Sequence, residues 1–152
     1  GDLGNQKFID CEFLNCNFTL SKVRGVSFQG VKFKSCKLLG LRFDQCSAFA
    51  LSFEFENCIL DHAVFHQLRV PKTKFYNCRM QEVDFTGADL TAAVFQNCNL
   101  QNAIFEQTNL SAADLSGAQY LLLDPEQNKI KKAKMLLEQL PGLLSRHLIV
   151  LV

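Results

Sequence analysis

A large hydrophobic residue recurs at every fifth position along most of this chain. In "YNCRMQEVDFTGADLTAAVF", for example, the large residues are Met80, Phe85, Leu90 and Phe95. A period of five fits neither an α-helix nor the simple alternation of a β-strand. It fits a chain that turns a corner every five residues and points the large side chain inward. A small residue usually lies two positions before each large one, and all seven cysteines of the sequence occupy that second position.

The stretches "FTGADLTAAVF" and "TNLSAADLSGA" show the repeat most clearly, with the pattern A-(D/N)-L-x-x. In this pattern the sequence resembles the pentapeptide-repeat family, over about four-fifths of its length. The resemblance implies an all-β fold, a right-handed quadrilateral parallel β-helix in which four pentapeptides form one coil. Residues 1–123 would then form about six coils, with a two-residue insertion near residues 48–54, and residues 124–152 an irregular last coil and a short C-terminal helical cap. Leu3 is already in register, so we expect further coils or another molecule to cover the first edge.

Residues one coil apart should stack, and the sequence supports this because like residues fall into the same column. One column of large residues is almost entirely aromatic and contains Phe13, Phe33, Phe55, Phe75 and Phe95. A second column contains Phe65, Phe85 and Phe105, and two further columns end at Leu110 and Tyr120. Buried phenylalanines of this kind contribute about 2–3 kcal/mol each, so these ladders should supply most of the stability.

The cysteines form a column of their own, made of Cys16, Cys36, Cys58, Cys78 and Cys98. Free cysteine behaves as a small hydrophobic residue and suits an inward position with little room. A linear row of parallel thiols cannot surround a metal ion tetrahedrally, and parallel Cβ directions are poor geometry for disulfides. We therefore expect reduced, structural thiols with no metal and no cofactor, preceded by asparagines such as Asn77 that hydrogen-bond from coil to coil.

The remaining composition narrows the class of protein. The net charge is +1, which argues against direct binding of nucleic acid. No apolar run approaches the roughly 20 residues that span a bilayer, so we expect no membrane partner. A row of unpaired thiols fits a reducing, cytoplasmic location. The three histidines, His62, His66 and His147, have no catalytic partners at suitable spacing, so we expect no enzyme activity.

The insertion between Phe43 and Phe55 leaves Phe49 and Phe53 outside the repeat. Two interpretations remain open. Either side chain could fill a gap at the corner beside Ala48. Alternatively, the two aromatic residues form an exposed bulge that binds a partner, since departures from a regular repeat often carry function.

The C-terminal segment after Asp124-Pro125 changes character. Ile130 and Met135 return to the five-residue frame, "LLEQLPGLLSRHL" reads as a short amphipathic helix, and "IVLV" as a final strand. Such a cap would protect the open end of the β-helix. The basic residues here are either a solvated face or a site for an acidic partner: Lys129, Lys131, Lys132 and Lys134.

This ending is similar to that of the quinolone-resistance and microcin self-immunity members of the family. The resemblance implies a bacterial protein that forms homodimers through its C-terminal cap, with Leu143, Leu144, Ile149 and Val150 at the interface. It also implies a protein partner, the type II topoisomerase DNA gyrase. The sequence thus favours a non-enzymatic scaffold that binds a macromolecule, with a topoisomerase-interacting resistance protein and a purely structural module as alternatives.

Overall fold

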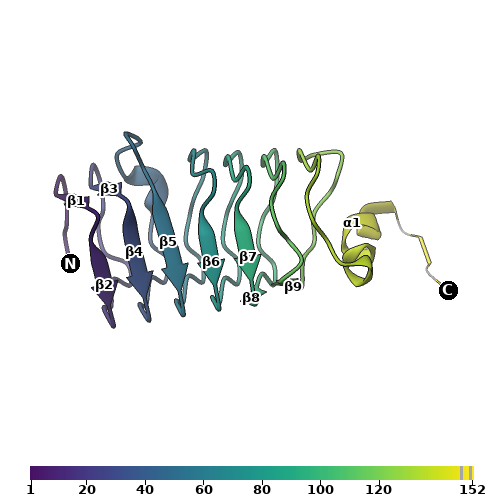
Figure 1. Ribbon diagram of the computed structural model, residues 1–152, viewed down its shortest axis with the longest axis horizontal. Coiled ribbons are helices and arrows are strands. Elements are labelled where there is room, and N and C mark those ends of the chain that lie inside the picture. Colours follow the sequence, from purple (N-terminus) through teal and green to yellow (C-terminus); the bar gives the residue numbers. More distant parts are fainter. Residues whose placement is uncertain (148, 151) are drawn as a thin grey trace.

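The computed structural model describes residues 1–147, 149, 150 and 152, with the side chain of Arg146 left out. The chain winds into about six stacked coils that form a parallel β-solenoid, as the repeat predicts. Figure 1 shows the coils side by side along the long axis, with the N-terminus at one end and helix α1 (Pro141–Leu144) at the other. The fold expected from the sequence is confirmed.

One face of the solenoid forms a continuous parallel sheet in the order β2-β4-β5-β6-β7. Its strands are short, as the five-residue repeat requires: β2 (Glu12–Leu14), β4 (Val31–Lys34), β5 (Phe53–Glu56), β6 (Lys74–Tyr76) and β7 (Val94–Gln96). Two smaller sheets pair β1 (Lys7–Ile9) with β3 (Ser27–Gln29) and β8 (Cys98–Asn99) with β9 (Ala118–Gln119). Single parallel bridges, such as Arg79 with Asn99, link the coils elsewhere.

The interior is filled by the two predicted phenylalanine ladders. In the first, Phe55 stacks on Phe75 with ring centroids 5.2 Å apart and planes 5° from parallel. In the second, Phe65 stacks on Phe85 at 5.1 Å. The ladders meet edge to face, as in the Phe65–Phe75 pair, which is a favoured arrangement of aromatic rings. Phe13 in the first coil is half-buried, whereas the ladder phenylalanines from Phe33 to Phe105 are buried.

Most corners of the coils use a residue with positive φ, two positions after the large inward residue. In the column before the cysteines the φ values are 52–54°, at Asn15, Ser35, Asn57, Asn77 and Asn97. Asparagine tolerates this left-handed conformation better than most residues. In each Asn-Cys pair, such as Asn57-Cys58 or Asn77-Cys78, the asparagine therefore forms the corner and the cysteine is the small inward residue. The predicted amide ladder is more limited: among the described residues it comprises Asn77, Asn97 and Gln119.

The insertion increases the spacing between paired residues of adjacent coils from 20 to 22, since Phe33 pairs with Phe55. Phe53 lies in register with Val31, at the inward position that a small residue normally takes, and only 6% of it is exposed. Its ring lies 5.0 Å from that of Phe43. Ala48, expected inside, is exposed and Leu51 is buried instead, because the extra residues carry Ala48 outward. A short helix, η1 (Phe43–Gln45), precedes this loop.

The C-terminal end differs from expectation at three points. Tyr120, expected inside, is 65% exposed with φ 58°, while Leu121 and Leu123 are buried. The expected amphipathic helix consists of three short turns: η2 (Leu137–Gln139), α1 and η3 (Ser145–His147). Ile149 and Val150 are not in a strand, and the rest of the expected final strand includes Leu151, which lies outside the described residues.

Candidate protein-binding surfaces

The insertion loop presents one aromatic side chain to solvent. Phe49 is 76% exposed, and its backbone N–H is held by the Ser47 hydroxyl at 3.3 Å. The loop leads directly into β5 (Figure 1), whose first residue, Phe53, packs into the core. For Phe53 the structure supports the first of the two interpretations, because its ring fills the interior at the corner, and its assignment to a partner-binding bulge is wrong. Phe49 remains available on a rigid base.

The cysteine column lies inside the solenoid and is not a reactive site. The Cys58 thiol donates to the Phe33 carbonyl at 3.2 Å, and the Cys98 thiol to the Phe75 carbonyl at 3.3 Å. Burial raises the pKa of Cys36 to about 11. Hydrogen bonds with the Cys58 and Cys98 thiols, together with burial, hold the pKa of Cys78 well above its ordinary value. These thiols act as small donors that satisfy carbonyl groups of a neighbouring coil.

Thr108 also donates a hydrogen bond to a carbonyl group of a neighbouring coil, with a hydroxyl in place of a thiol. Its hydroxyl donates to the Phe85 carbonyl at 2.8 Å, which is the bond that Cys98 makes with Phe75. At these positions the small inward residue is therefore a compact hydrogen-bond donor. Among the described residues, no group of histidine, cysteine, aspartate and glutamate could hold a metal ion.

The cap closes the last coil through the side chain of Gln139. Its Nε2 donates to the carbonyl oxygens of Leu115 at 2.7 Å and Ala118 at 2.9 Å. Its Oε1 accepts the backbone N–H of Leu136 at 2.7 Å. In earlier coils the carbonyl two positions before the large residue accepts a backbone N–H, as when Asn99 donates to Cys78. Gln139 therefore stands in for the strand that the next coil would have added.

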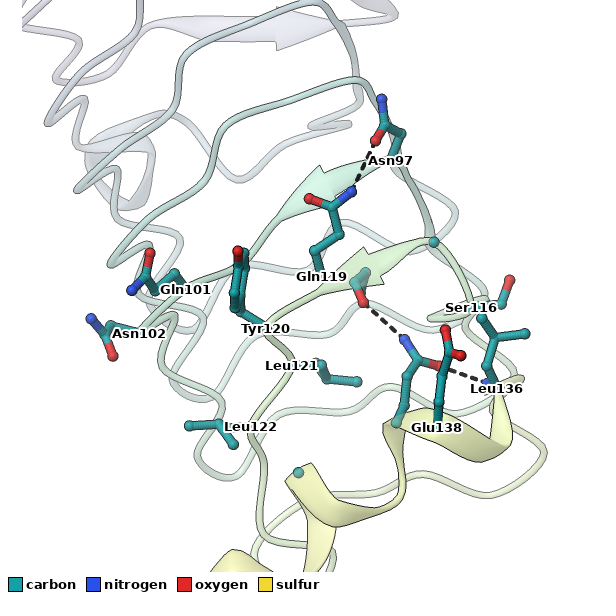
Figure 2. A pocket seen from close by; sticks show the side chains of 14 residues that line it. Asn97, Gln101, Asn102, Ser116, Gln119, Tyr120, Leu121, Leu122, Leu136 and Glu138 are labelled. Carbon is teal, nitrogen blue, oxygen red and sulfur yellow. Dashed lines mark hydrogen bonds between the residues drawn. The ribbon is translucent and has the colours of Figure 1, made fainter.

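Beside Gln139 lies an open groove of about 780 Å³. Figure 2 shows Tyr120, Leu121 and Leu122 on one side of it and Leu136 and Glu138 on the other. Amide side chains continue its lining, at Asn97, Gln101, Asn102 and Gln119. The sequence interpretation missed this groove because it placed Tyr120 inside. A signal was present, since Gln139 follows Gln119 by one coil length although it lies in the segment expected to form a helix.

The cap also carries an exposed apolar surface, but not all of the predicted interface residues belong to it. Leu143 is only 8% exposed and is part of the core, so it is not available to a second molecule. Leu144 is half-buried, whereas Ile149 and Val150 are exposed. The leucine of η2, Leu137, is 82% exposed. A shallow hollow of about 570 Å³ on this surface is lined by Leu137, Glu138, Leu140, Pro141, Leu144 and Val152.

The predicted basic cluster is exposed on the last, partial coil. Lys129 bridges Asn109 and Lys134 bridges Asp114 through their backbones, and Lys132 occupies a corner with φ 61°. The side chains of all four lysines, Lys131 included, face solvent. The coil expected over residues 124–135 therefore carries this cluster at its edge.

Comparison with known proteins identifies the family from which this architecture comes. A family model described as a pentapeptide repeat region matches residues 51–135, which is more than half of the chain. The chain belongs to the pentapeptide-repeat family. The comparison with curated proteins found no match.

The fold is shared with a solved structure of another protein. A trypsin-treated form of QnrB1, described as a plasmid-mediated fluoroquinolone resistance protein, matches with a TM-score of 0.75 at 20% identity. The match covers 99% of this chain and 83% of the QnrB1 chain. The pentapeptide repeat protein Rfr23 from the cyanobacterium Cyanothece 51142 matches at 17% identity over 90% of this chain and 88% of its own, with a TM-score of 0.39. The QnrB1 match shows that the solenoid and its cap are a shared fold.

None of the helices in the described part of the chain is long and apolar enough to cross a membrane.

Proposed function

We propose that this protein is a non-enzymatic scaffold that binds a macromolecular partner, most directly a protein, through the insertion loop. The observation that carries the proposal is the exposure of Phe49, 76% of which faces solvent in a chain that buries most other phenylalanines. The repeat is broken at this loop, and the break moves an aromatic side chain outward. Loops on rigid scaffolds carry binding functions far more often than the scaffold itself.

The energetics of such an anchor are favourable. Large aromatic side chains are enriched among the few residues that supply most of the binding energy at interfaces. The base of the loop is held by Phe53, which is packed against Phe28 and Phe43. A partner that covers Phe49 would therefore order little additional chain, which lowers the entropic cost of association.

A more specific candidate for the partner is a type II topoisomerase such as DNA gyrase. The support for it is the match over 99% of this chain to the fold of QnrB1, itself described as a fluoroquinolone resistance protein. The cytoplasm is the location that this function requires, and the buried row of free thiols is compatible with it.

The test uses purified gyrase and a bacterial host. Expression of the wild-type protein should raise the tolerated fluoroquinolone concentration and alter gyrase supercoiling in the presence of the drug. Phe49→Ala should weaken both effects about tenfold if Phe49 is an anchor. Leu20→Ala is a matched control, because Leu20 is also a highly exposed large apolar residue, on another coil. No effect of the wild-type protein in either assay rejects the topoisomerase as partner.

The wider scaffold proposal has its own test. Turnover of any substrate in broad hydrolase and transferase panels would overturn the non-enzymatic assignment. A Phe49→Ala variant that supports every cellular phenotype of the wild-type protein would favour the purely structural alternative.

We also propose that a homodimer forms through the apolar surface of the cap, with interface residues revised from those expected. Leu137, Leu140 and Leu144 replace Leu143 as the central contacts, because Leu143 is buried within one molecule. Leu137→Asp should give a folded monomer in light scattering, whereas Leu143→Asp should lose stability. A wild-type protein that is monomeric at high concentration contradicts the dimer.

The basic cluster offers a separate surface for an acidic partner. Its members face solvent around one corner of the last coil, so their attraction for an acidic partner should be screened by salt. If the partner binds here, exchanging Lys131 and Lys132 for glutamate weakens binding at low salt and removes its salt dependence. An unchanged affinity assigns the cluster to a solvated face.

A further inference from the structure

The groove beside Tyr120 exposes backbone groups that have no partner among the described residues. In the five coils before it, the large residue of this column donates its N–H to the next coil, as when Leu100 donates to the Gln119 carbonyl at 3.0 Å. The same register would make Tyr120 donate to the carbonyl of residue 139. Residue 139 lies in η2 and offers its side chain instead.

The Gln139 side chain replaces only some of the hydrogen bonds that a further coil would make with this edge. It satisfies the Ala118 carbonyl, but it supplies no acceptor for the Tyr120 N–H. Within the described residues, the N–H and carbonyl groups of Tyr120, Leu121 and Leu122 make no hydrogen bond within the protein. The chain is pinned again at Leu123, whose N–H donates to Gly142 at 3.3 Å. Leu121 is only 6% exposed and its carbonyl lies against Gly142. Tyr120 and Leu122, which are exposed, therefore present open donors and acceptors next to the groove.

The side chains around these groups indicate what could bind. Tyr120, Leu122 and Leu136 offer exposed apolar surface, and the neighbouring lining residues add amide groups. Among the lining residues that the structure describes, Glu138 is the charged one and none is basic. A phosphate or another anion would meet a carboxylate and no compensating cation. A peptide backbone matches the alternating donors and acceptors, and a lysine or arginine would match Glu138.

We propose that this groove binds a short peptide segment of a partner protein, through its backbone, with a basic side chain placed beside Glu138. The inference rests on the proposed scaffold function and gives it a second, chemically defined site. Addition of a peptide to an open sheet edge is a common recognition mode, in which main-chain hydrogen bonds give affinity and side-chain contacts give specificity. The volume of about 780 Å³ is that of a site for a small ligand or a few residues rather than a domain.

The probe is a phage-displayed library of linear random decapeptides, selected on the immobilised full chain. Enriched sequences should contain lysine or arginine. A fluorescein-labelled peptide of the enriched sequence should bind the wild-type protein in fluorescence anisotropy. Glu138→Lys and Tyr120→Ala should each weaken it roughly tenfold or more, as expected for an anchor contact. Glu126→Lys is the charge-matched control, because Glu126 is exposed and does not line the groove, and it should bind as the wild type does.

Hydrogen exchange distinguishes backbone pairing from simple apolar contact. Saturating peptide should slow exchange at the amides of Tyr120 to Leu122, and methylation of alternate amide nitrogens in the peptide should abolish binding. No enriched sequence, or an enriched peptide that binds Glu138→Lys and Tyr120→Ala as it binds the wild type, overturns the inference. If that peptide is instead lost with Phe49→Ala, the scaffold function stands and the groove is not its site.

Self-association is the remaining outcome. If the wild-type protein dimerises with rising concentration and Glu138→Lys prevents this, the groove is occupied by a second copy of the chain. That result overturns a foreign peptide as the occupant.

Discussion

The middle coils and the C-terminal end of this solenoid obey the same repeat with opposite results. Phe75 and Phe95, in the middle, are fully buried. Tyr120 stands one coil after Leu100 in the same column, yet its ring faces solvent. The difference is the presence of a neighbouring coil on both sides. A five-residue pattern specifies which side chain can turn inward, but a covering coil is needed to make the inward position favourable.

The insertion loop, which lies between complete coils, also shows that burial depends on a neighbouring coil. Phe49 and Phe53 are four residues apart, of the same type and equally outside the repeat. One fills the corner and the other projects from it, because only Phe53 falls in register with Val31 of the preceding coil. The burial of an aromatic residue here depends on its register with a neighbour, not on its hydrophobicity.

The largest expected effect compares these two kinds of phenylalanine. Phe75→Ala removes a ring stacked on both sides and should lower the free energy of unfolding by about 3–5 kcal/mol. Phe49→Ala removes an exposed ring and should change it by less than about 0.5 kcal/mol. Urea denaturation followed by circular dichroism measures both. Equal losses for the two variants would show that the insertion loop is part of the core.

The interior could be predicted because the signal is local and repeated many times. Two inward positions in each five residues, stacked one coil apart, determine the ladders of Phe33 and Phe65 without any long-range information. The exceptions required knowledge of three-dimensional neighbours. Whether Ala48 or Leu51 turns inward depends on how two extra residues are accommodated at a corner, which the pattern alone does not determine.

The candidate binding surfaces were less predictable than the core for the same reason. Phe49 was identified because it breaks the pattern. The groove was not, since it arises from an absent strand and a substitute side chain, Gln139, whose role depends on the path of the cap. Leu143 and Leu144 looked equivalent in sequence, but the turn of α1 directs Leu143 into the core.

The second prediction concerns the Gln139 side chain, which takes the place of a further strand at the end of the solenoid. Gln139→Ala removes the donor to the carbonyl oxygens of Leu115 and Ala118. Loss of a partner for such groups costs about 1–3 kcal/mol, so the cap should open more often. Hydrogen exchange should speed up at the amide of Leu143, which belongs to helix α1 of the cap, and not at the amide of Phe75. Gln127→Ala is the control, because Gln127 is an exposed glutamine of the last coil. Similar exchange in both variants would contradict the role given to Gln139.

The third prediction separates corner from core in the Asn-Cys pair. Asn57 has φ 54°, a conformation that disfavours β-branched residues strongly. Asn57→Val should cost about 1–2 kcal/mol, whereas Asn57→Gly should cost only about 0.5 kcal/mol because glycine adopts positive φ freely. Thermal unfolding of the two variants provides the comparison. If the valine variant is as stable as the glycine variant, the corner is not strained by a side chain.

The smallest expected effect comes from the thiols of the interior. Burial raises the pKa of Cys46 to about 12 and that of Cys36 to about 11, whereas an unfolded thiol titrates near a pKa of about 8.5. The folded state therefore holds the proton at pH values where the unfolded state loses it. The contribution of these thiols to stability should be constant below about pH 8.5 and should be lost as pH rises toward 11–12, with a loss of about 1 kcal/mol or less per thiol at pH 9.

Urea denaturation at a series of pH values tests this, with Cys46→Ala as the comparison. The variant lacks one raised thiol, so its stability should fall less steeply above pH 8.5 than that of the wild type. Lysines and tyrosines titrate in both proteins and cancel in the difference. Parallel slopes would mean that Cys46 is open to solvent in the folded protein, and the corner before the insertion would then be looser than the coils on either side of it.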